Sequence, residues 1–364
     1  MNQTPPLPSS SPPPPSPSPS PSPLRDGATF EDELAAALTD RSLHLIVLPT
    51  EQCNFRCTYC YEDFAIGRMQ PPTVQGIKLL LARRMGDLRN LNVSWFGGEP
   101  LLARTIVEDI SSFIVDSMSA APHLDYAGDV TTNGYHLDVS TAERWERLGI
   151  RSYQISLDGP EAVHDTTRRR ANGGGSFQQI WSNLLALRRS SLPIRILLRI
   201  HLTPANVPSM REFLPELRDT FLEDDRFSVR LKPIEKLGGP NNDGIDVLDR
   251  EARDRIHDDL SSLLRTGAPA RAGGTRTEPC YASRPNSLVI RANGSIGKCT
   301  VALGDPSNTI GRIRPDGVLE IDGDQLSPWV RGWTGQDRAA LTCPYAGLPR
   351  PPRELLHIGT RPPG

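Results

Sequence analysis

The stretch Cys53-Asn-Phe-Arg-Cys57-Thr-Tyr-Cys60 places three cysteines within eight residues, directly after the apolar run Leu43–Pro49. Three thiolates on one short loop can converge on one metal centre. Zinc would need a fourth protein ligand to close a structural tetrahedron, and the sequence has no histidine between His44 and His123. Three cysteines instead suit a 4Fe–4S cluster that keeps one iron open for another molecule. We therefore expect Cys53, Cys57 and Cys60 to bind such a cluster.

The run before these cysteines is the first of six strand candidates, which alternate with helix-period segments from residue 43 to about residue 265. Several candidates are apolar on nearly every residue, as expected for parallel strands covered on both faces. Six strand–helix repeats predict an α/β fold, a partial (β/α)6 TIM-like barrel with its functional loops at the strand C-terminal ends. The strand candidates are Leu43–Pro49, Leu91–Phe96, Asp129–Thr132, Tyr153–Leu157, Ile194–Leu202 and Phe227–Leu231.

Amphipathic helices are expected between the strands. Apolar residues from Val74 to Leu88, and again from Phe177 to Leu187, step by three or four along one helical face. The pairs Ser140–Glu143 and Ser176–Gln179 have the spacing of capping boxes, which predicts that helices begin there.

Both flanks of this barrel differ from it in composition. Residues 1–23 contain 11 Pro and 7 Ser and no charged side chain, too little apolar area to offset the entropy of ordering. We expect a disordered arm there, either a plain spacer or a PxxP-type ligand. The predicted organisation is an arm at 1–28, the barrel at 40–265, a smaller domain at 278–347 and a Pro- and Arg-rich tail at 348–364.

The composition excludes several classes of protein. The chain has 364 residues with 41 Lys+Arg against 43 Asp+Glu, a formal net charge of −2, which argues against a main role in binding nucleic acid or an anionic membrane. No apolar stretch approaches the roughly 18 residues of a membrane span, and the N-terminus lacks the features of a secretory signal. Its 6 cysteines are too few for a disulfide scaffold. We therefore expect a cytoplasmic protein.

The cysteine motif, with Tyr59 before its last cysteine, resembles the signature of the radical S-adenosylmethionine (radical SAM) enzymes. Motifs at the ends of the later strands follow in the order of that family, and together they cover roughly residues 43–235. They are Trp95-Phe96-Gly97-Gly98-Glu99-Pro100, Val130-Thr131-Thr132-Asn133-Gly134, Ser156-Leu157-Asp158-Gly159, His164-Asp165-Thr166-Thr167-Arg168, Gly173–Gly175 and Leu198-Arg199-Ile200.

This resemblance implies a 4Fe–4S cluster and SAM as cofactors. In the family, the open iron chelates the amine and carboxylate of SAM, and one electron from the cluster cleaves the sulfonium C–S bond. The resulting 5′-deoxyadenosyl radical abstracts a hydrogen atom from the substrate. The resemblance also implies an oxidoreductase-type enzyme that needs an electron donor such as flavodoxin or ferredoxin.

The resemblance assigns the methionine end of SAM to three neighbouring residues. Gly97 and Gly98 let the backbone approach the amino group, since glycine has no side chain to block contact, and Glu99 offers an acceptor. Asn133 is expected to orient the same end of the cofactor. Tyr59 is expected to support the adenine.

Other positions carry open alternatives. Ser156 and Asp158 face the same way from a strand end and are candidates for the ribose hydroxyls, although Asp158 before Gly159 suits a turn equally well. Arg168 is expected to pair with the SAM carboxylate, with a solvated charge run as the alternative. Arg199 lies among apolar residues, where an unpaired guanidinium is costly, so a role in the site is favoured. His164 and Asp165 are expected to cap helices or join hydrogen-bond networks.

A hairpin is predicted after the barrel. Ser287–Arg291 and Gly294–Thr300 read as its strands around Ala292-Asn293-Gly294. Cys280 and Cys299 flank it, and Cys343 comes later.

These three cysteines resemble the first half of the SPASM/twitch extension, which carries auxiliary iron–sulfur clusters in peptide-modifying radical SAM enzymes. A complete SPASM domain needs more cysteines, so two auxiliary clusters are excluded by count. One auxiliary Fe–S cluster on Cys280, Cys299 and Cys343 is expected, with an open or non-cysteine fourth position. The alternatives are a fold that has lost its cluster, and ordinary half-buried cysteines.

The resemblance implies a radical SAM enzyme that modifies a peptide or protein, and we favour maturation of a ribosomally made peptide by crosslinking, thioether formation, epimerisation or oxidation. One alternative is a formylglycine-generating enzyme like the anaerobic sulfatase maturases. Another is an inactive relative that binds a peptide, against which the complete cysteine triad argues. A third alternative, a zinc-dependent nucleic-acid binder, would need a basic face and a fourth zinc ligand. The near-neutral net charge and the missing ligand both argue against it. We expect neither a nucleic-acid nor a membrane partner.

Overall fold

A computed structural model describes residues 29–265 and 279–348 of the chain. The predicted arm, the residues between the two predicted domains and nearly all of the predicted tail lie outside these residues. Within them, ten strands form one sheet in the order β12-β11-β10-β9-β1-β3-β4-β5-β7-β8, and β2 pairs with β6 in a second, two-stranded sheet. The strands are β1 (Ser42–Val47), β2 (Phe55–Cys57), β3 (Asn90–Trp95), β4 (Asp125–Thr132), β5 (Ile150–Leu157), β6 (Arg168–Arg170), β7 (Arg195–Leu202), β8 (Phe227–Pro233), β9 (Ser287–Ile290), β10 (Ser295–Gly297), β11 (Thr309–Ile313) and β12 (Leu319–Ile321).

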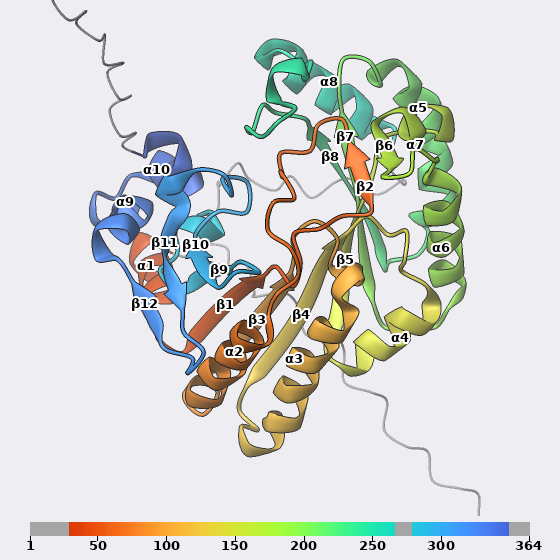
Figure 1. Ribbon diagram of the computed structural model, residues 1–364. Coiled ribbons are helices and arrows are strands. Elements are labelled where there is room, and N and C mark those ends of the chain that lie inside the picture. Colours follow the sequence, from red (N-terminus) through yellow and green to blue (C-terminus); the bar gives the residue numbers. More distant parts are fainter. Residues whose placement is uncertain (1–28, 266–278, 349–364) are drawn as a thin grey trace, which may run out of the picture.

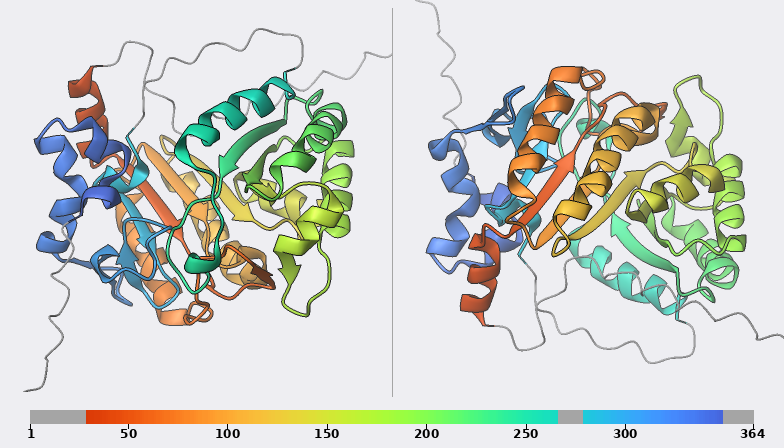
Figure 2. Two further views of the ribbon diagram at one scale, coloured as in Figure 1. Left: turned by 90° about the horizontal axis from the view of Figure 1, so that it is seen from above. Right: turned by 90° about the horizontal axis from the view of Figure 1, so that it is seen from below.

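The six strand candidates of the barrel are confirmed as β1, β3, β4, β5, β7 and β8, which pair in parallel with their neighbours. Helices α2, α3, α4, α6 and α7 lie along the outside of this curved sheet (Figures 1 and 2). The fold is therefore the predicted partial TIM-like barrel. The helices are α1 (Phe30–Leu38), α2 (Pro71–Arg84), α3 (Arg104–Ser117), α4 (Val139–Arg147), α5 (Glu161–Thr167), α6 (Phe177–Arg189), α7 (Val207–Phe221), α8 (Arg250–Ser262), α9 (Gly323–Thr334) and α10 (Arg338–Thr342). None of the helices in the described parts of the chain is both long and apolar enough to cross a bilayer.

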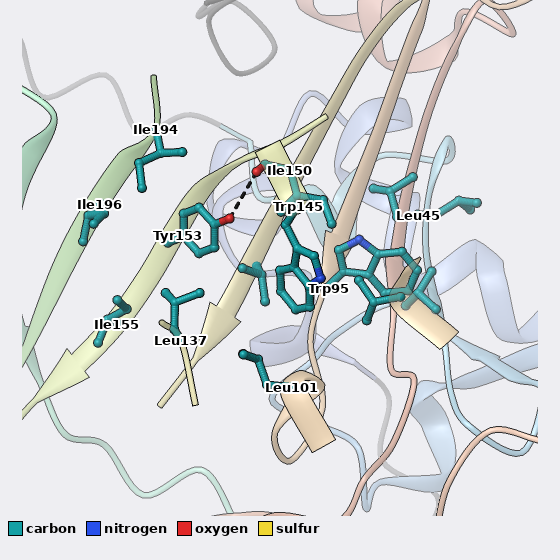
Figure 3. Packing of buried hydrophobic residues seen from close by; sticks show 14 of the residues in the cluster. Leu45, Trp95, Leu101, Leu137, Trp145, Ile150, Tyr153, Ile155, Ile194 and Ile196 are labelled. Atoms are coloured by element: carbon teal, nitrogen blue, oxygen red, sulfur yellow. Dashed lines mark hydrogen bonds between the residues drawn. The ribbon is translucent and has the colours of Figure 1, made fainter. Parts of the chain in front are cut away.

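The two faces of the barrel sheet differ, unlike the continuous apolar burial expected from the sequence. In β3, β4 and β7 buried residues alternate with partly exposed ones. The apolar residues of this alternation form the core with the outer helices, where Trp95 and Trp145 are fully buried and the Tyr153 hydroxyl donates to the Ile150 carbonyl at 3.3 Å (Figure 3). Polar side chains such as Ser156 and Arg199 line a cavity instead.

Both predicted capping boxes are wrong in detail. Helix α4 begins two residues earlier than expected, with Asp138 as its N-cap accepting from the Thr141 amide. Helix α6 does begin after Ser176, but the Ser176 hydroxyl donates to the Arg168 carbonyl at 2.7 Å. Asp165 accepts the Ser176 and Phe177 amides in its place, at 2.8 and 3.0 Å, which is the capping role expected of Asp165.

The C-terminal segment continues the barrel sheet. Strand β9 lies parallel to β1, and the predicted hairpin is confirmed by the antiparallel pairing of β9 with β10. Helix α1 lies beside α9 and α10 (Figure 1), where Ala37, Trp333 and Leu341 form a small apolar cluster. The first and last described parts of the chain therefore pack together on one flank of the barrel.

His44 joins the barrel to this segment. Its Nε2 lies 2.9 Å from Ser94 Oγ on β3, and its Nδ1 lies 3.1 Å from Ser287 Oγ on β9. Removal from water, together with the nearby charges of Arg284 and Lys298, lowers the pKa of His44 to about 4. The folded state therefore holds His44 neutral at a pH where the unfolded chain binds a proton.

This shift predicts a loss of stability in mild acid. Because the folded pKa lies below the usual 6.5, the contribution of His44 is complete above pH 6.5 and is lost as the pH falls toward 4. At pH 5 the loss is about 1–2 kcal/mol. Urea unfolding at pH 7 and pH 5 should show a smaller pH effect in His44→Gln than in the wild type. His257→Gln, on exposed α8, should keep the wild-type effect, and equal pH effects in all three proteins would contradict the assignment.

Candidate functional site

A cavity of about 230 Å³ lies at the C-terminal ends of the barrel strands. Its wall combines the cysteine loop with residues from the ends of β3, β4, β5, β7 and β8 and with Thr300 and Val301 of the C-terminal segment. Ten of the twelve residues expected at the SAM site and its first cluster line this cavity, and Glu99 and Asp158 do not. Those expected from the sequence that line it are Cys53, Cys57, Cys60, Tyr59, Gly97, Gly98, Asn133, Ser156, Arg168 and Arg199.

The three cysteines of the motif are held by a short β-strand pair. Cys57 ends β2 and lies opposite Arg168 of β6 in the antiparallel pairing of these two strands, so an arginine is placed next to the cysteine loop. Figure 1 shows β2 and β6 side by side. The Phe55 amide donates to Cys53 Sγ at 3.3 Å. Burial raises the pKa of all three thiols, that of Cys60 to about 12. Thiolates here therefore require a strong positive partner.

The thiols are not gathered around a single point. Across residues 29–265 and 279–348, no group of three His, Cys, Asp or Glu side chains is arranged to hold one metal ion. A cluster has a different requirement, because each of its thiolates binds an iron of its own.

Gly97 and Gly98 lie against the backbone that leads into the cysteine loop. A Cβ on Gly97, where φ is +112°, would lie 2.2 Å from the Thr50 carbonyl oxygen, and one on Gly98 would lie 2.5 Å from that of Gln52. The Glu99 amide donates to the same Gln52 carbonyl at 3.0 Å. Glycine is needed here because β3 and the cysteine loop meet backbone to backbone.

Glu99 lies behind the cavity wall, with no exposed surface. One carboxylate oxygen accepts the Thr132 hydroxyl and the Leu101 amide, at 2.8 and 3.0 Å, and the other accepts the Asn133 amide at 2.7 Å. In this geometry its carboxylate ties the end of β3 to the end of β4. Asn133 donates in turn to Asn54 Oδ1 at 2.8 Å, which fastens the cysteine loop to β4.

Tyr59 is held by a buried network of charged side chains. Its hydroxyl donates to Asp158, 2.8 Å from either oxygen, accepts from Arg168 Nη1 at 2.8 Å, and lies 3.0 Å from His201 Nδ1. Burial alone would raise the pKa of Asp158, but the His201 hydrogen bond and the Arg168 charge outweigh it and hold that pKa well below its usual value. Asp158 is thus a charged anchor for Tyr59.

Asp158 does not line the cavity, and it also accepts the Thr167 hydroxyl at 2.6 Å. His164 joins the same network as expected from the sequence, since its Nδ1 accepts the Asp158 amide at 3.4 Å and its Nε2 lies 3.0 Å from Ser176 Oγ. Gly159 follows with φ +127°, so the turn expected at this position is present as well.

Two guanidinium groups in the cavity wall keep an unused donor. The Nε atoms of Arg168 and Arg199 are buried and have no hydrogen-bond partner among the described residues. Arg199 lies opposite Ser156 in the pairing of β5 with β7. The arginines therefore offer donors to an oxygen-bearing or anionic molecule in the cavity.

Several lining residues were not identified from the sequence. His201 and Gln154 lie two positions from Arg199 and Ser156, so strand alternation was a signal that would have found them. Lys232 and Glu235 at the end of β8, and Glu62 after the cysteines, had no such signal. Burial and the charge of Glu51 raise the pKa of Glu62 to about 8.

The C-terminal cysteines lie beside the barrel. The Cys280 amide donates to the Leu341 carbonyl at 2.8 Å, two residues before Cys343, and the charges of Cys299 and Cys343 both act to raise the pKa of Cys280, after burial as the main cause. The Asn308 side chain binds the Cys299 amide and carbonyl, at 2.9 and 2.8 Å. The three cysteines thus share one neighbourhood.

The sequence profile of the radical SAM superfamily matches residues 47–214, which hold the cysteine loop, both glycines and the Tyr59 network. Residues 47–214 are a radical SAM domain. This match confirms the family resemblance given above. The radical SAM family uses a 4Fe–4S cluster and SAM.

Curated relatives match parts of the chain. An uncharacterized protein of Methanocaldococcus jannaschii is 30% identical over 55% of this chain and 66% of its own length. A GTP 3′,8-cyclase of Haemophilus influenzae is 31% identical over 32% of this chain and 34% of its own length. A cysteine-type anaerobic sulfatase-maturating enzyme of Clostridium novyi is 26% identical over 53% of each chain. The chain therefore matches less than two thirds of the length of these relatives.

Two solved structures share the fold over most of the chain. Native anSMEcpe with bound AdoMet and the Cp18Cys peptide has a TM-score of 0.56 at 17% identity, covering 80% of this chain and 82% of that one. SuiB of Streptococcus suis bound to S-adenosylmethionine has a TM-score of 0.50 at 15% identity, covering 80% and 66%. At such identities the likeness establishes the fold.

Proposed function

We propose that this chain is a radical SAM enzyme that modifies a peptide or protein, most simply by maturing a ribosomally made peptide. One observation carries the proposal: a single cavity is lined by three thiols and by two arginines whose buried Nε atoms have no partner in the described part of the chain. A 4Fe–4S cluster requires the thiols as ligands, and a cosubstrate that carries a carboxylate requires donors such as the two arginines.

The cavity fits these cofactors residue by residue. Cys53, Cys57 and Cys60 would hold the 4Fe–4S cluster. Backbone next to Gly97 and Gly98, together with Asn133, would hold the methionine end of SAM, with Glu99 fixing their positions. When bound and reduced, the cluster would supply the electron that cleaves SAM to methionine and a 5′-deoxyadenosyl radical, and that radical would take a hydrogen atom from the substrate.

The remaining wall residues would orient the cosubstrate. Arg168 and Arg199 would donate to its carboxylate or hydroxyl oxygens, and Ser156 would face the ribose. Tyr59 would support the adenine from a ring position that Asp158 and Arg168 hold rigidly. The aromatic and apolar side chains in the wall, Phe55, Phe64 and Phe96 among them, would exclude water from the reacting atoms.

We propose in addition one auxiliary iron–sulfur cluster on Cys280, Cys299 and Cys343. Lys298 supports it, because this lysine has no exposed surface and its Nζ donates to the carbonyls of Arg284 and Ser287, at 2.6 and 2.5 Å. The charge that acts favourably on Lys298 is that of Cys280. A buried ammonium is costly without an anion, and cluster-bound thiolates would supply that anion.

The relatives support a peptide or protein as the substrate. The Clostridium novyi relative is named as a maturase of sulfatases, and the solved neighbours include anSMEcpe complexes with a Cp18Cys peptide and with a Kp18Cys peptide. An external one-electron donor, such as flavodoxin or ferredoxin, would reduce the cluster.

The proposal is tested with anaerobically reconstituted protein. After addition of SAM and dithionite we expect 5′-deoxyadenosine, and an EPR change of the reduced protein when SAM is added. A short peptide encoded next to the gene should then change mass in the same mixture. Absence of 5′-deoxyadenosine from protein with full iron content would refute the enzymatic function.

The second candidate, a formylglycine-generating sulfatase maturase, rests on the Clostridium novyi relative. A synthetic peptide containing a sulfatase Cys or Ser motif distinguishes the two, since only a maturase would convert that residue to formylglycine. An inactive peptide-binding relative would bind peptide and form no 5′-deoxyadenosine.

A further inference from the structure

A second cavity, of about 710 Å³, adjoins the one that carries the cysteine loop. Tyr61, Glu62, Leu237 and Val301 line both cavities. The loop after the cysteines, the segment after β8 and the C-terminal segment from Val301 to Pro306 form the walls of the second cavity. Glu62 therefore lies on the wall that the two cavities share.

Glu62 has a buried carboxylate oxygen without a partner. The residue is 8% exposed, and its Oε2 has no hydrogen-bond partner among residues 29–265 and 279–348. No Lys, Arg or His of those residues forms an ion pair with it. A buried acceptor left unpaired is costly, so a hydrogen-bond donor that reached this oxygen would be favourable.

The positive side chain in the wall of the second cavity, Arg291, is already committed. Arg291 donates to both oxygens of Glu51, at 3.2 and 2.5 Å, and to the Leu303 carbonyl at 2.7 Å. Glu51 and Asp63 line the second cavity together with Glu62. With Asp305, which lines it too, four acidic side chains share this cavity with one guanidinium, and that guanidinium pairs with Glu51.

We propose that Glu62 recognises a cationic side chain, lysine or arginine, of the peptide substrate as it extends from the first cavity into the second. This inference rests on the proposed function. A neutral amide would satisfy the oxygen atom but would leave the excess of carboxylates uncompensated, whereas an ammonium or guanidinium does both. The substrate class is therefore a peptide with a basic residue close to the residue that is modified.

The test measures binding without chemistry. Reconstituted holoenzyme is saturated with SAM and given no reductant. The probes are two end-blocked peptides, three repeats of Gly-Ala-Ser-Lys and three repeats of Gly-Ala-Ser-norleucine, so that the cation comes only from side chains and its spacing is not critical. We expect the lysine peptide to bind about tenfold more tightly, as for a hydrogen bond to a charged group.

Glu62→Gln keeps the shape and removes the acidic group, and it should bind both peptides equally. Asp258→Asn is the matched control, because Asp258 is 89% exposed on α8 and the same change from carboxyl to amide is made there; it should keep the preference. Iron content and thermal unfolding of each variant show that the cysteine loop is intact.

The possible outcomes distinguish the role of Glu62 from the proposed function. Equal binding of both peptides by the wild type, or a lysine preference that survives Glu62→Gln, would overturn the role of Glu62 and leave the proposed function standing. Absence of binding by either peptide, with SAM still cleaved after reduction, would overturn the peptide substrate together with the role of Glu62.

Discussion

Cys57→Ala is expected to bind less iron by about one cluster and to form no more 5′-deoxyadenosine than protein without reductant. Cys57 is the central thiol of the motif and the residue paired with Arg168 in the β2–β6 ladder. Its loss removes a cluster ligand and leaves the buried Arg168 guanidinium facing an apolar methyl group. Iron quantitation and chromatography of the SAM products measure both effects.

Cys343→Ala is the matched control. Cys343 is an exposed cysteine outside the radical SAM domain, so its replacement should leave SAM cleavage intact while lowering iron content only at the auxiliary site. SAM cleavage by Cys57→Ala at the wild-type rate would show that the motif does not hold the catalytic cluster.

Gly98→Ala is expected to lower the free energy of unfolding by about 3 kcal/mol, at the upper end for overpacked sites. A Cβ there would lie 2.5 Å from the Gln52 carbonyl oxygen, 2.6 Å from its carbon and 2.8 Å from the Glu51 carbonyl oxygen. All three are backbone atoms, so the strain can be relieved only by moving the segment that leads into Cys53. Iron content should fall along with stability.

Gly86→Ala provides the comparison for urea unfolding, since a Cβ at Gly86 meets nothing within 4 Å. Its free energy of unfolding should stay near that of the wild type, and its iron content should be unchanged. Equal stability of the Gly98 and Gly86 variants would mean that the cysteine loop tolerates displacement from β3.

The barrel was predictable because its signal is local. Apolar runs and helical periodicity are properties of short windows, and the six strands from β1 to β8 were found with ends shifted by a few residues. The capping boxes failed for a different reason. The Ser176 hydroxyl is engaged by Arg168 and Asp165 supplies the cap from eleven residues earlier, and spacing within one helix cannot reveal such competition.

The prediction of the functional site from the sequence has the same limit. Ten of the residues expected at the cofactors line the cavity, because strand ends meet at one edge of a parallel sheet. Glu99 and Asp158 lie behind it, since their carboxylates bind Thr132, Asn133, Tyr59 and Thr167. Those contacts join separate strands and depend on tertiary packing. Glu62 was missed because its unpaired oxygen is visible only once the burial of that oxygen is known.

The parallel pairing of β1 with β9 has a consequence for how the protein is made. Ser287 and His44, which face each other across these strands, are 243 residues apart in the sequence. A nascent polypeptide still on the ribosome therefore exposes one unpaired edge of its earliest barrel strand until β9 has been translated. We expect the segment just before the cysteine loop to reach its final rigidity late in biosynthesis, after the C-terminal hairpin has left the exit tunnel.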